Sequence, residues 1–309
     1  MRVAAAQLAP VYLDRDATIE KVAKATTDAA NLDVSLLAFP ETFVPGYPSW
    51  ADYTHASYFD HPEQKTAWAR YVEASVDVSR GDLDPVVTAA REGGVFVYLG
   101  VLERSLSRGS VYASLVAIHP TRGIVSVHRK LKPTYGERLM WADGDGAGLV
   151  AHDWAGTRVS GLNCWENWMP LARAAMYAQG TQIHVAAWPG SPAISHDISK
   201  FIAREGRVFV VSSGSVLRAE HIPDDFPLKT EMMEETQVFC GGGAIIVAPD
   251  GTVLAEAQPD EETIIHADLH LGMTTQERQN FDPAGHYSRP DVLRLMVNRS
   301  RQVPAEFID

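Results

Sequence analysis

Short apolar runs rich in Val, Ile, Leu and Ala recur along the whole of this 309-residue chain, and they limit the folds that it can adopt. Runs of this length and composition, separated by turn or helix signals, are typical of β-strands. We expect strands over residues 2–8, 34–39, 95–102, 111–118, 124–130, 157–164, 182–187, 207–213, 244–248, 252–257 and 263–269. A chain with so many strands builds its core from sheets.

Helical patterns separate the early runs, whereas tight turns separate some of the later ones. Asp16 is expected to cap one helix, and a second helix is expected over 83–91. Residues 120–123 and 249–251 contain the Pro and Gly that reversing turns prefer. This order predicts an α/β (α+β) sandwich in which helices flank a mixed sheet or a pair of sheets, rather than a uniform βαβ series.

The charge and the apolar content exclude several classes of function. The net charge of −12 predicts an acidic surface that repels nucleic-acid backbones and anionic membranes, so we expect neither as a partner. No uncharged apolar run approaches the roughly 20 residues that span a bilayer. The N-terminal sequence MRVAAAQLAP lacks the parts of a signal peptide, which favours a cytoplasmic protein.

Acidic residues are concentrated between residues 221 and 262, where ten carboxylates face a single base, Lys229. A cation site and a solvated face are both open as interpretations. The solvated face is the more common origin of such a pattern, so we favour it. Only two cysteines occur, Cys164 and Cys240, which is too few for a Cys-rich zinc site.

Cys164 stands where an expected strand ends, and Pro170 then opens a helix. A thiol at such an elbow points out of the sheet edge, and a helix N-terminus favours its anion. We therefore expect a nucleophile whose pKa is lowered, although a buried, structural cysteine stays open as the alternative. Cys240 has no comparable context and is expected to be buried and inert.

A thiol nucleophile needs a base, and two other strand ends carry suitable groups. Glu41 follows an apolar strand among prolines and aromatic residues, where burial raises the pKa of a carboxyl group towards the range of a general base. Lys130 ends the second strand of the first hairpin. Eleven histidines leave a Cys–His pair open, but none stands in a cysteine-protease-type context. Because open sheets place ligand sites at the carboxyl ends of strands, we expect Glu41, Lys130 and Cys164 to meet.

Three blocks of sequence closely resemble the signature blocks of the nitrilase branch of the carbon–nitrogen hydrolase superfamily. They are FPETFVPGYP with Glu41, HRKLKPTYGER with Lys130 and GLNCWENWMP with Cys164. The resemblance extends over most of the chain, from VAAAQLAPVYL to GGGAIIVAPDGTVLAEA. The Trp-Glu pair after the cysteine and the HVAAWP segment are similar to true nitrilases rather than to amidases.

The resemblance implies an αββα sandwich over residues 1–285 with a short C-terminal extension over 286–309. It also implies a catalytic triad of Glu41, Lys130 and Cys164, with a second glutamate, Glu137, as a further catalytic residue, and no metal or organic cofactor. Family members pair through their helical faces, so a homodimer or a higher homo-oligomer is expected. Because the chain ends soon after Val303, without the long tail of many microbial nitrilases, the size of the oligomer stays open.

The implied reaction is hydrolysis of a nitrile, with water as co-substrate, to a carboxylic acid and ammonia through a covalent thioimidate and then a thioester on Cys164. An amidase or N-carbamoyl hydrolase with the same triad and a cyanide dihydratase are the alternatives, and a non-enzymatic module is disfavoured because the triad is intact. Aromatic, arylacetic and aliphatic nitriles all stay open. The candidate substrate-binding residues are Tyr47, Trp50, Tyr53, Thr134, Trp165 and Trp188.

Overall fold

The computed structural model describes residues 1–303, 305 and 308, and it contains two six-stranded sheets packed face to face. The first sheet has the strand order β14-β1-β2-β3-β4-β5, in which β1, β2 and β3 are parallel neighbours and the other neighbours are antiparallel. Its strands are β1 (Arg2–Gln7), β2 (Val34–Ala38), β3 (Phe96–Arg104), β4 (Val111–His119), β5 (Gly123–Arg129) and β14 (Thr263–Asp268).

The second sheet has the order β13-β12-β9-β8-β7-β6, with β7, β8 and β9 parallel at its centre. Its strands are β6 (His152–Trp154), β7 (Thr157–Asn163), β8 (Ile183–Trp188), β9 (Phe209–Gly214), β12 (Ile245–Val247) and β13 (Val253–Glu256). A separate two-stranded ribbon joins β10 (Val216–Arg218) to β11 (Val238–Gly241). All eleven predicted strands are confirmed. The strands β6, β10 and β11 have three or four residues and lack an apolar run as long as those that mark the other strands, so the sequence does not predict them.

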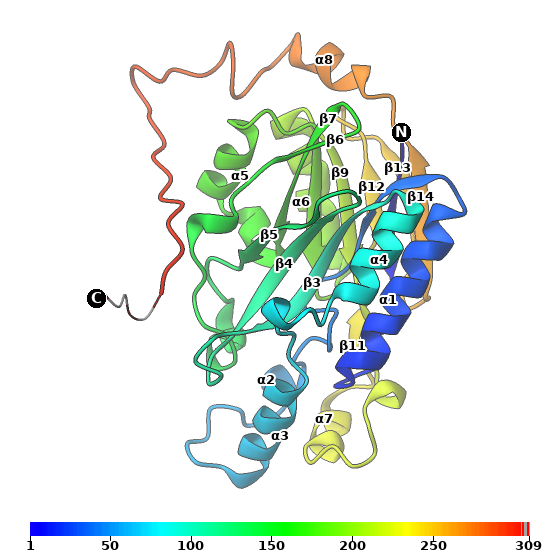
Figure 1. The fold of residues 1–309 in the computed structure, drawn as a ribbon, viewed down its shortest axis with the longest axis vertical. Helices are drawn as coiled ribbons and strands as arrows, with labels where there is room; N and C mark the ends of the chain where they lie inside the picture. The colour runs from blue at the N-terminus through cyan, green and yellow to red at the C-terminus, as the bar shows by residue number, and fades with distance from the viewer. Residues whose placement is uncertain (304, 306–307, 309) are drawn as a thin grey trace.

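Helices cover the outer face of each sheet. The α-helices are α1 (Arg15–Ala30), α2 (Trp50–Tyr53), α3 (Pro62–Glu73), α4 (Asp84–Gly93), α5 (Pro170–Tyr177), α6 (Pro192–Gly206), α7 (Lys229–Glu235) and α8 (Gly272–Arg278). Short 3₁₀ segments are η1 (Val78–Arg80), η2 (Tyr135–Leu139), η3 (Gly146–Gly148), η4 (Cys164–Trp168) and η5 (Ala219–His221). In Figure 1, α1 and α4 lie side by side on the first sheet, while α5 and α6 lie on the other side of the molecule.

The cap predicted for the first helix is wrong by two residues. The side chain of Asp14 accepts a hydrogen bond from the N–H of Ala17 at 3.0 Å, so Asp14 is the N-cap of α1. Asp16 lies in the first turn and pairs with Arg15 at 2.7 Å. Both acids suit a helix start chemically, and only the backbone register distinguishes them.

The four layers follow from the alternation of side chains along the strands. Val3 and Ala5 of β1 belong to the core between the two sheets, whereas Ala4 and Ala6 belong to the core under α1 and α4. A third core cluster joins the second sheet to α6. The predicted αββα sandwich is therefore confirmed, and its parallel strands send their carboxyl ends to one edge of each sheet.

Both predicted reversing turns are confirmed. Gly123, the first residue of β5 after the turn from β4, has φ +71°, and Gly251 has φ +91° between β12 and β13. Glycine takes these left-handed conformations without the steric cost of a Cβ. Among the described residues, no helix combines the length and the apolar character needed to cross a bilayer.

The acidic stretch 221–262 is consistent with the solvated face that we favoured. Its carboxylates form pairs at the surface, such as Asp224 with Lys229 at 2.7 Å and Glu262 with Lys21 at 2.7 Å. Across residues 1–303, no group of three metal-ligating side chains occurs within this stretch.

The chain after α8 continues without a helix or strand over residues 279–303. Figure 1 shows this segment in orange and red along the outside of the molecule. Its far end contacts Asp145, which pairs with Arg301 at 3.1 Å and accepts a hydrogen bond from the N–H of Gln302 at 3.0 Å. Four residues of the predicted extension 286–309, namely 304, 306, 307 and 309, lie outside the described residues.

Candidate active site

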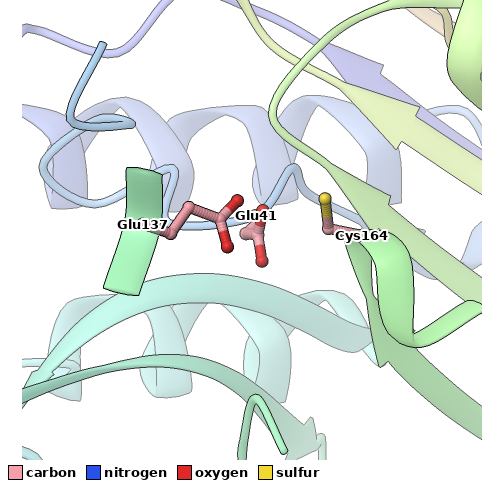
Figure 2. Close-up of side chains that lie close together, drawn as sticks. All are labelled: Glu41, Glu137 and Cys164. Atoms are coloured by element: carbon pink, nitrogen blue, oxygen red, sulfur yellow. The ribbon is translucent and has the colours of Figure 1, made fainter. Parts of the chain in front are cut away.

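The structure brings together the ends of three strands that belong to two different sheets. Glu41 lies three residues after β2, Lys130 follows β5 directly and Cys164 follows β7 directly. The Lys130 Nζ lies 2.9 Å from Glu41 Oε1. One carboxylate oxygen each of Glu41 and Glu137 and the sulfur of Cys164 lie within 4.8 Å of one another. Figure 2 shows the Glu41 carboxylate between Glu137 and Cys164.

Both sheets hold the turn that carries Glu41. The N–H of Glu41 donates to the carbonyl oxygen of Trp188 in β8 at 3.2 Å, and the N–H of Val44 donates to the carbonyl oxygen of Gly100 in β3 at 3.2 Å. The backbone of this turn lies directly on Gly100, since a Cβ there would meet the carbonyl oxygen of Pro40 at 2.0 Å. Gly100 therefore leaves the space that allows Glu41 to reach the second sheet.

Cys164 occupies a strained elbow. Its φ is +48°, a left-handed value that costs a residue with a Cβ on the order of 1–3 kcal/mol and that is frequent at active sites. The side-chain amide of Asn167 donates to the carbonyl oxygens of Cys164 at 3.0 Å and of Leu162 at 3.2 Å. These bonds hold the turn that directs the thiol away from the sheet.

The prediction that the pKa of Cys164 is lowered is wrong. The residue is only 3% exposed, and burial together with the nearby Glu41 raises the pKa of its thiol well above the ordinary value, although Lys130 acts in the opposite direction. The residues directly after β7 form the short 3₁₀ segment η4, and the predicted helix begins only at Pro170, six residues after Cys164. Cys164 therefore rests as a thiol and needs a base to ionise it.

Glu41 has the properties of that base. Burial raises the pKa of its carboxyl group to about 8, against the effect of Lys130 and with a further contribution from Glu137. Neither carboxylate oxygen accepts a well-formed hydrogen bond from another described residue. A carboxylate with free lone pairs and a pKa near neutrality can accept a proton from a neighbouring thiol and return it.

Glu137 neutralises Lys130 and fixes its position. The Nζ of Lys130 donates to Glu137 Oε2 at 2.6 Å, and the same oxygen accepts a hydrogen bond from the N–H of Thr134 at 2.6 Å. The other oxygen accepts one from the hydroxyl group of Tyr47 at 3.1 Å. Burial lowers the pKa of Lys130, but electrostatic coupling to the acidic groups around it, Cys164, Glu41 and Glu137, together with the hydrogen bond to Glu137, outweighs this effect and raises it. Lys130 is consequently a permanent ammonium ion.

The donor set of Glu41, Glu137 and Cys164 could in principle hold a metal ion. However, the ammonium group of Lys130 lies 2.9 Å from one carboxylate and 2.6 Å from the other. A metal cation would have to occupy the same place as this charge. The arrangement fits proton transfer and anion stabilisation better than metal binding.

A cavity of about 430 Å³ opens onto Cys164 and Glu137. Five of the six candidate substrate-binding residues line it, namely Tyr47, Tyr53, Thr134, Trp165 and Trp188. Trp50 does not: it is fully buried in a core cluster and packs edge-to-face on Tyr71, with the ring centroids 4.9 Å apart. Glu41 and Lys130 lie beneath the cavity, each 1% exposed.

Sequence reasoning missed part of the cavity wall. Asp52, Tyr135 and the β11 segment from Val238 to Gly241 also line the cavity. Cys240 is buried as expected, and burial raises the pKa of its thiol to about 12. No local pattern connects β11 with Cys164, because tertiary contacts bring that segment to the site: β11 pairs with β10, and the N–H of Gly241 donates to the carbonyl oxygen of Gly190 at 3.1 Å.

Comparisons with known proteins agree with this geometry. A family model described as carbon–nitrogen hydrolase matches residues 2–279. "Nitrilase 2" from an unknown prokaryotic organism is 39% identical over 98% of this chain and 94% of its own length. An aliphatic nitrilase of Rhodococcus rhodochrous is 35% identical over 100% of this chain and 82% of its own. A carbon–nitrogen hydrolase structure from Helicobacter pylori G27 has a TM-score of 0.68 at 18% identity, over 96% of this chain and 100% of that chain, which shows the fold alone.

Proposed function

Because the chain belongs to the carbon–nitrogen hydrolase family, within its nitrilase branch, we propose that it hydrolyses an organic nitrile to the carboxylic acid and ammonia, with Glu41, Lys130 and Cys164 as its catalytic residues. One observation carries this proposal. A buried thiol in the wall of a cavity with several aromatic side chains lies beside a carboxyl group of raised pKa and an ammonium group.

In the first step, Glu41 accepts the proton of Cys164 as the sulfur attacks the nitrile carbon. Glu41 then passes the proton to the nitrogen, so that a neutral thioimidate results. Negative charge develops on the nitrogen during the attack, and Lys130 can stabilise it. The backbone N–H of Trp165 lies against the thiol, where it can stabilise the same charge.

Two water molecules complete the reaction. The first, deprotonated by Glu41, adds to the thioimidate carbon; Glu41 relays both protons of this water to the nitrogen, the C–N bond breaks, ammonia leaves and a thioester remains. The second, again deprotonated by Glu41, releases the carboxylic acid and restores the thiol. Glu137 takes no proton in this scheme but holds Lys130 in place. Covalent catalysis thus divides one difficult addition into easier steps.

An assay of ammonia and acid release on matched pairs of nitriles and amides tests the function. The panel includes aromatic, arylacetic and aliphatic nitriles, the corresponding amides, an N-carbamoyl amino acid and cyanide. We expect turnover of at least one nitrile class, with the matched amide a poorer substrate. Hydrolysis of the amides or carbamoyl compounds alone would replace the proposal with the amidase alternative, and hydrolysis of cyanide alone would indicate a cyanide dihydratase.

Lys130→Met should lower kcat by about 10²–10³, the typical cost of one donor to a developing anion. It should also lower the free energy of unfolding by about 3–5 kcal/mol, because Glu137 loses its buried counter-ion. Lys132→Met is the matched control, since Lys132 pairs with Asp143 at the surface, two residues away. Kinetics and denaturant unfolding of both variants check this prediction. Equal kcat in the two variants would remove Lys130 from the mechanism.

We also propose that the catalytic domain covers residues 1–285 and acts in the cytoplasm as a homodimer or a higher homo-oligomer. A reducing compartment keeps the thiol of Cys164 available. Apolar side chains on the outer helices support an association, since Leu171 of α5 is 67% exposed and Phe201 of α6 is 51% exposed. Exposed apolar patches of this kind are common at protein interfaces.

A further inference from the structure

We infer that Glu166, together with His128, is a positioning residue that locks the strand end carrying Lys130 to the strand end carrying Cys164. The inference rests on the proposed function, because it assigns these two groups to one catalytic unit. It concerns a buried carboxylate that the reaction steps above leave without a task.

A single carboxylate joins the peptide groups next to both catalytic residues. Its Oε1 accepts a hydrogen bond from the N–H of Leu131 at 2.6 Å, and its Oε2 accepts one from the N–H of Asn163 at 2.9 Å. Leu131 follows Lys130, and Asn163 precedes Cys164. The first of these segments ends β5 and the second ends β7, which belong to different sheets with no strand pairing between them. Glu166 therefore supplies a hydrogen-bonded bridge that the sheets do not.

His128 completes the arrangement from within β5. Its Nε2 lies 3.1 Å and 3.0 Å from the two carboxylate oxygens, and both side chains are almost fully buried. The backbone of η3 is packed closely on the backbone of His128, since a Cβ on Gly148 would approach the His128 Cα to 2.2 Å. Burial raises the pKa of Glu166, but His128 and the two backbone N–H groups outweigh it, so the carboxylate stays ionised.

Glu166 acts on the reaction only through other groups. It is 1% exposed and does not line the cavity, so it cannot contact a substrate there. Its negative charge nevertheless contributes to raising the pKa of Glu41. A residue in this place should therefore affect kcat and the pH dependence of catalysis, while it leaves substrate affinity nearly unchanged.

Glu166→Gln tests this inference. The backbone N–H groups of Leu131 and Asn163 each need an acceptor oxygen, and the Gln side chain has only one. The two strand ends should therefore shift apart. We expect kcat to fall roughly 100-fold, which is the scale of a 1 Å misplacement. KM should change by less than about threefold, since the contacts that hold the substrate equally in the ground state and the transition state are not altered. The acidic limb of the pH–rate profile should move to lower pH, because a negative charge near Glu41 is lost.

Two further variants distinguish the effect of the charge of Glu166 from the effects of its side-chain length and of a general loss of stability. Glu166→Asp keeps the charge but shortens the bridge, so kcat should fall while the acidic limb stays in place; it also serves if the Gln variant fails to fold. Glu103→Gln is the matched control, because Glu103 is a buried carboxylate of β3 that bonds Arg129 and Ser114 within the first sheet and does not join the two sheets. It should leave kcat and the acidic limb unchanged.

The rate of Cys164 alkylation by iodoacetamide, measured against pH, gives a readout that needs no nitrile. In Glu166→Gln the rise of this rate should begin at lower pH than in the wild type. If kcat and the alkylation profile both match the wild type while stability falls, Glu166 is merely structural and the inference is overturned. If the wild type hydrolyses no nitrile, the proposed function fails, but the alkylation profile still decides the role of Glu166.

Discussion

Cys164→Ala should abolish the release of acid and ammonia from every nitrile that the wild type hydrolyses. The expected loss is on the order of 10⁶ in kcat, as when the nucleophile of a covalent hydrolase is removed. Neither water nor another side chain can replace the sulfur, because Glu137, the other cavity-lining group beside Glu41, is a far weaker nucleophile than a thiolate. Ammonia assays on variants whose fold is verified by circular dichroism check this result.

The covalent intermediate offers independent evidence for the same residue. When wild-type enzyme is quenched during turnover of a slow nitrile, intact mass should increase by the mass of the bound imidate or acyl group. After digestion, the added mass should lie on the peptide that contains Cys164, and the peptide that contains Cys240 should be unmodified. Cys164→Ser should retain at most a trace of activity. Acid formation by the Ala variant, or an adduct on Cys240, would show that the nucleophile is misassigned.

Local patterns were sufficient to predict where the site residues meet. Glu41, Lys130 and Cys164 each follow an apolar run, and runs that form strands place their ends at sheet edges. The pattern also predicted different roles for the two cysteines, since a helix start follows Cys164 but not Cys240. The sequence could therefore predict the chemical type of each site residue and its position at the end of a strand.

Properties that depend on packing between distant segments were out of reach. The thiol pKa of Cys164 was predicted with the wrong sign, because local sequence reports a nearby helix start but not the desolvation imposed by both sheets. Tyr47 and Trp50 are three residues apart and both aromatic, yet one lines the cavity and the other packs on Tyr71. Only the tertiary fold decides which way each ring faces.

The charges at the site account for how four ionisable groups can be buried together. Lys130 and Glu137 form a pair whose charges cancel. Glu41 and Cys164 both have raised pKa values, so below pH 8 each mostly retains its proton. The resting site is then close to neutral, which avoids the large cost of an unpaired buried charge. The same arrangement means that catalysis depends on the small fraction of Glu41 that is ionised at neutral pH.

Glu41→Gln should lower kcat by about 10⁴, the upper end of the range for a general base, because Cys164 does not ionise unaided. In the wild type, kcat/KM should rise with pH through about 8, the pKa to which burial raises the carboxyl group of Glu41. The variant should lack this limb. Rate measurements between pH 5 and pH 10 on both proteins check the prediction. A wild-type limb that persists unchanged in the variant would assign the base to another group.

Glu41→Gln, which lowers kcat, should increase the stability of the folded protein at neutral pH. The ordinary pKa of Glu41 is 4.5 and its pKa in the folded protein is about 8, so between these values the folded state holds a proton that the unfolded state releases. The wild type therefore loses stability as pH rises through this window, by about 1.4 kcal/mol per pH unit, whereas the Gln variant has no proton to lose. Denaturant unfolding at pH 5 and pH 8 should show the variant gaining stability relative to the wild type. Glu20→Gln, which replaces an exposed acid of α1, should show no such gain. A stability difference that does not change with pH would mean that Glu41 is ionised at rest, and the thiol of Cys164 would then face a carboxylate already able to take its proton.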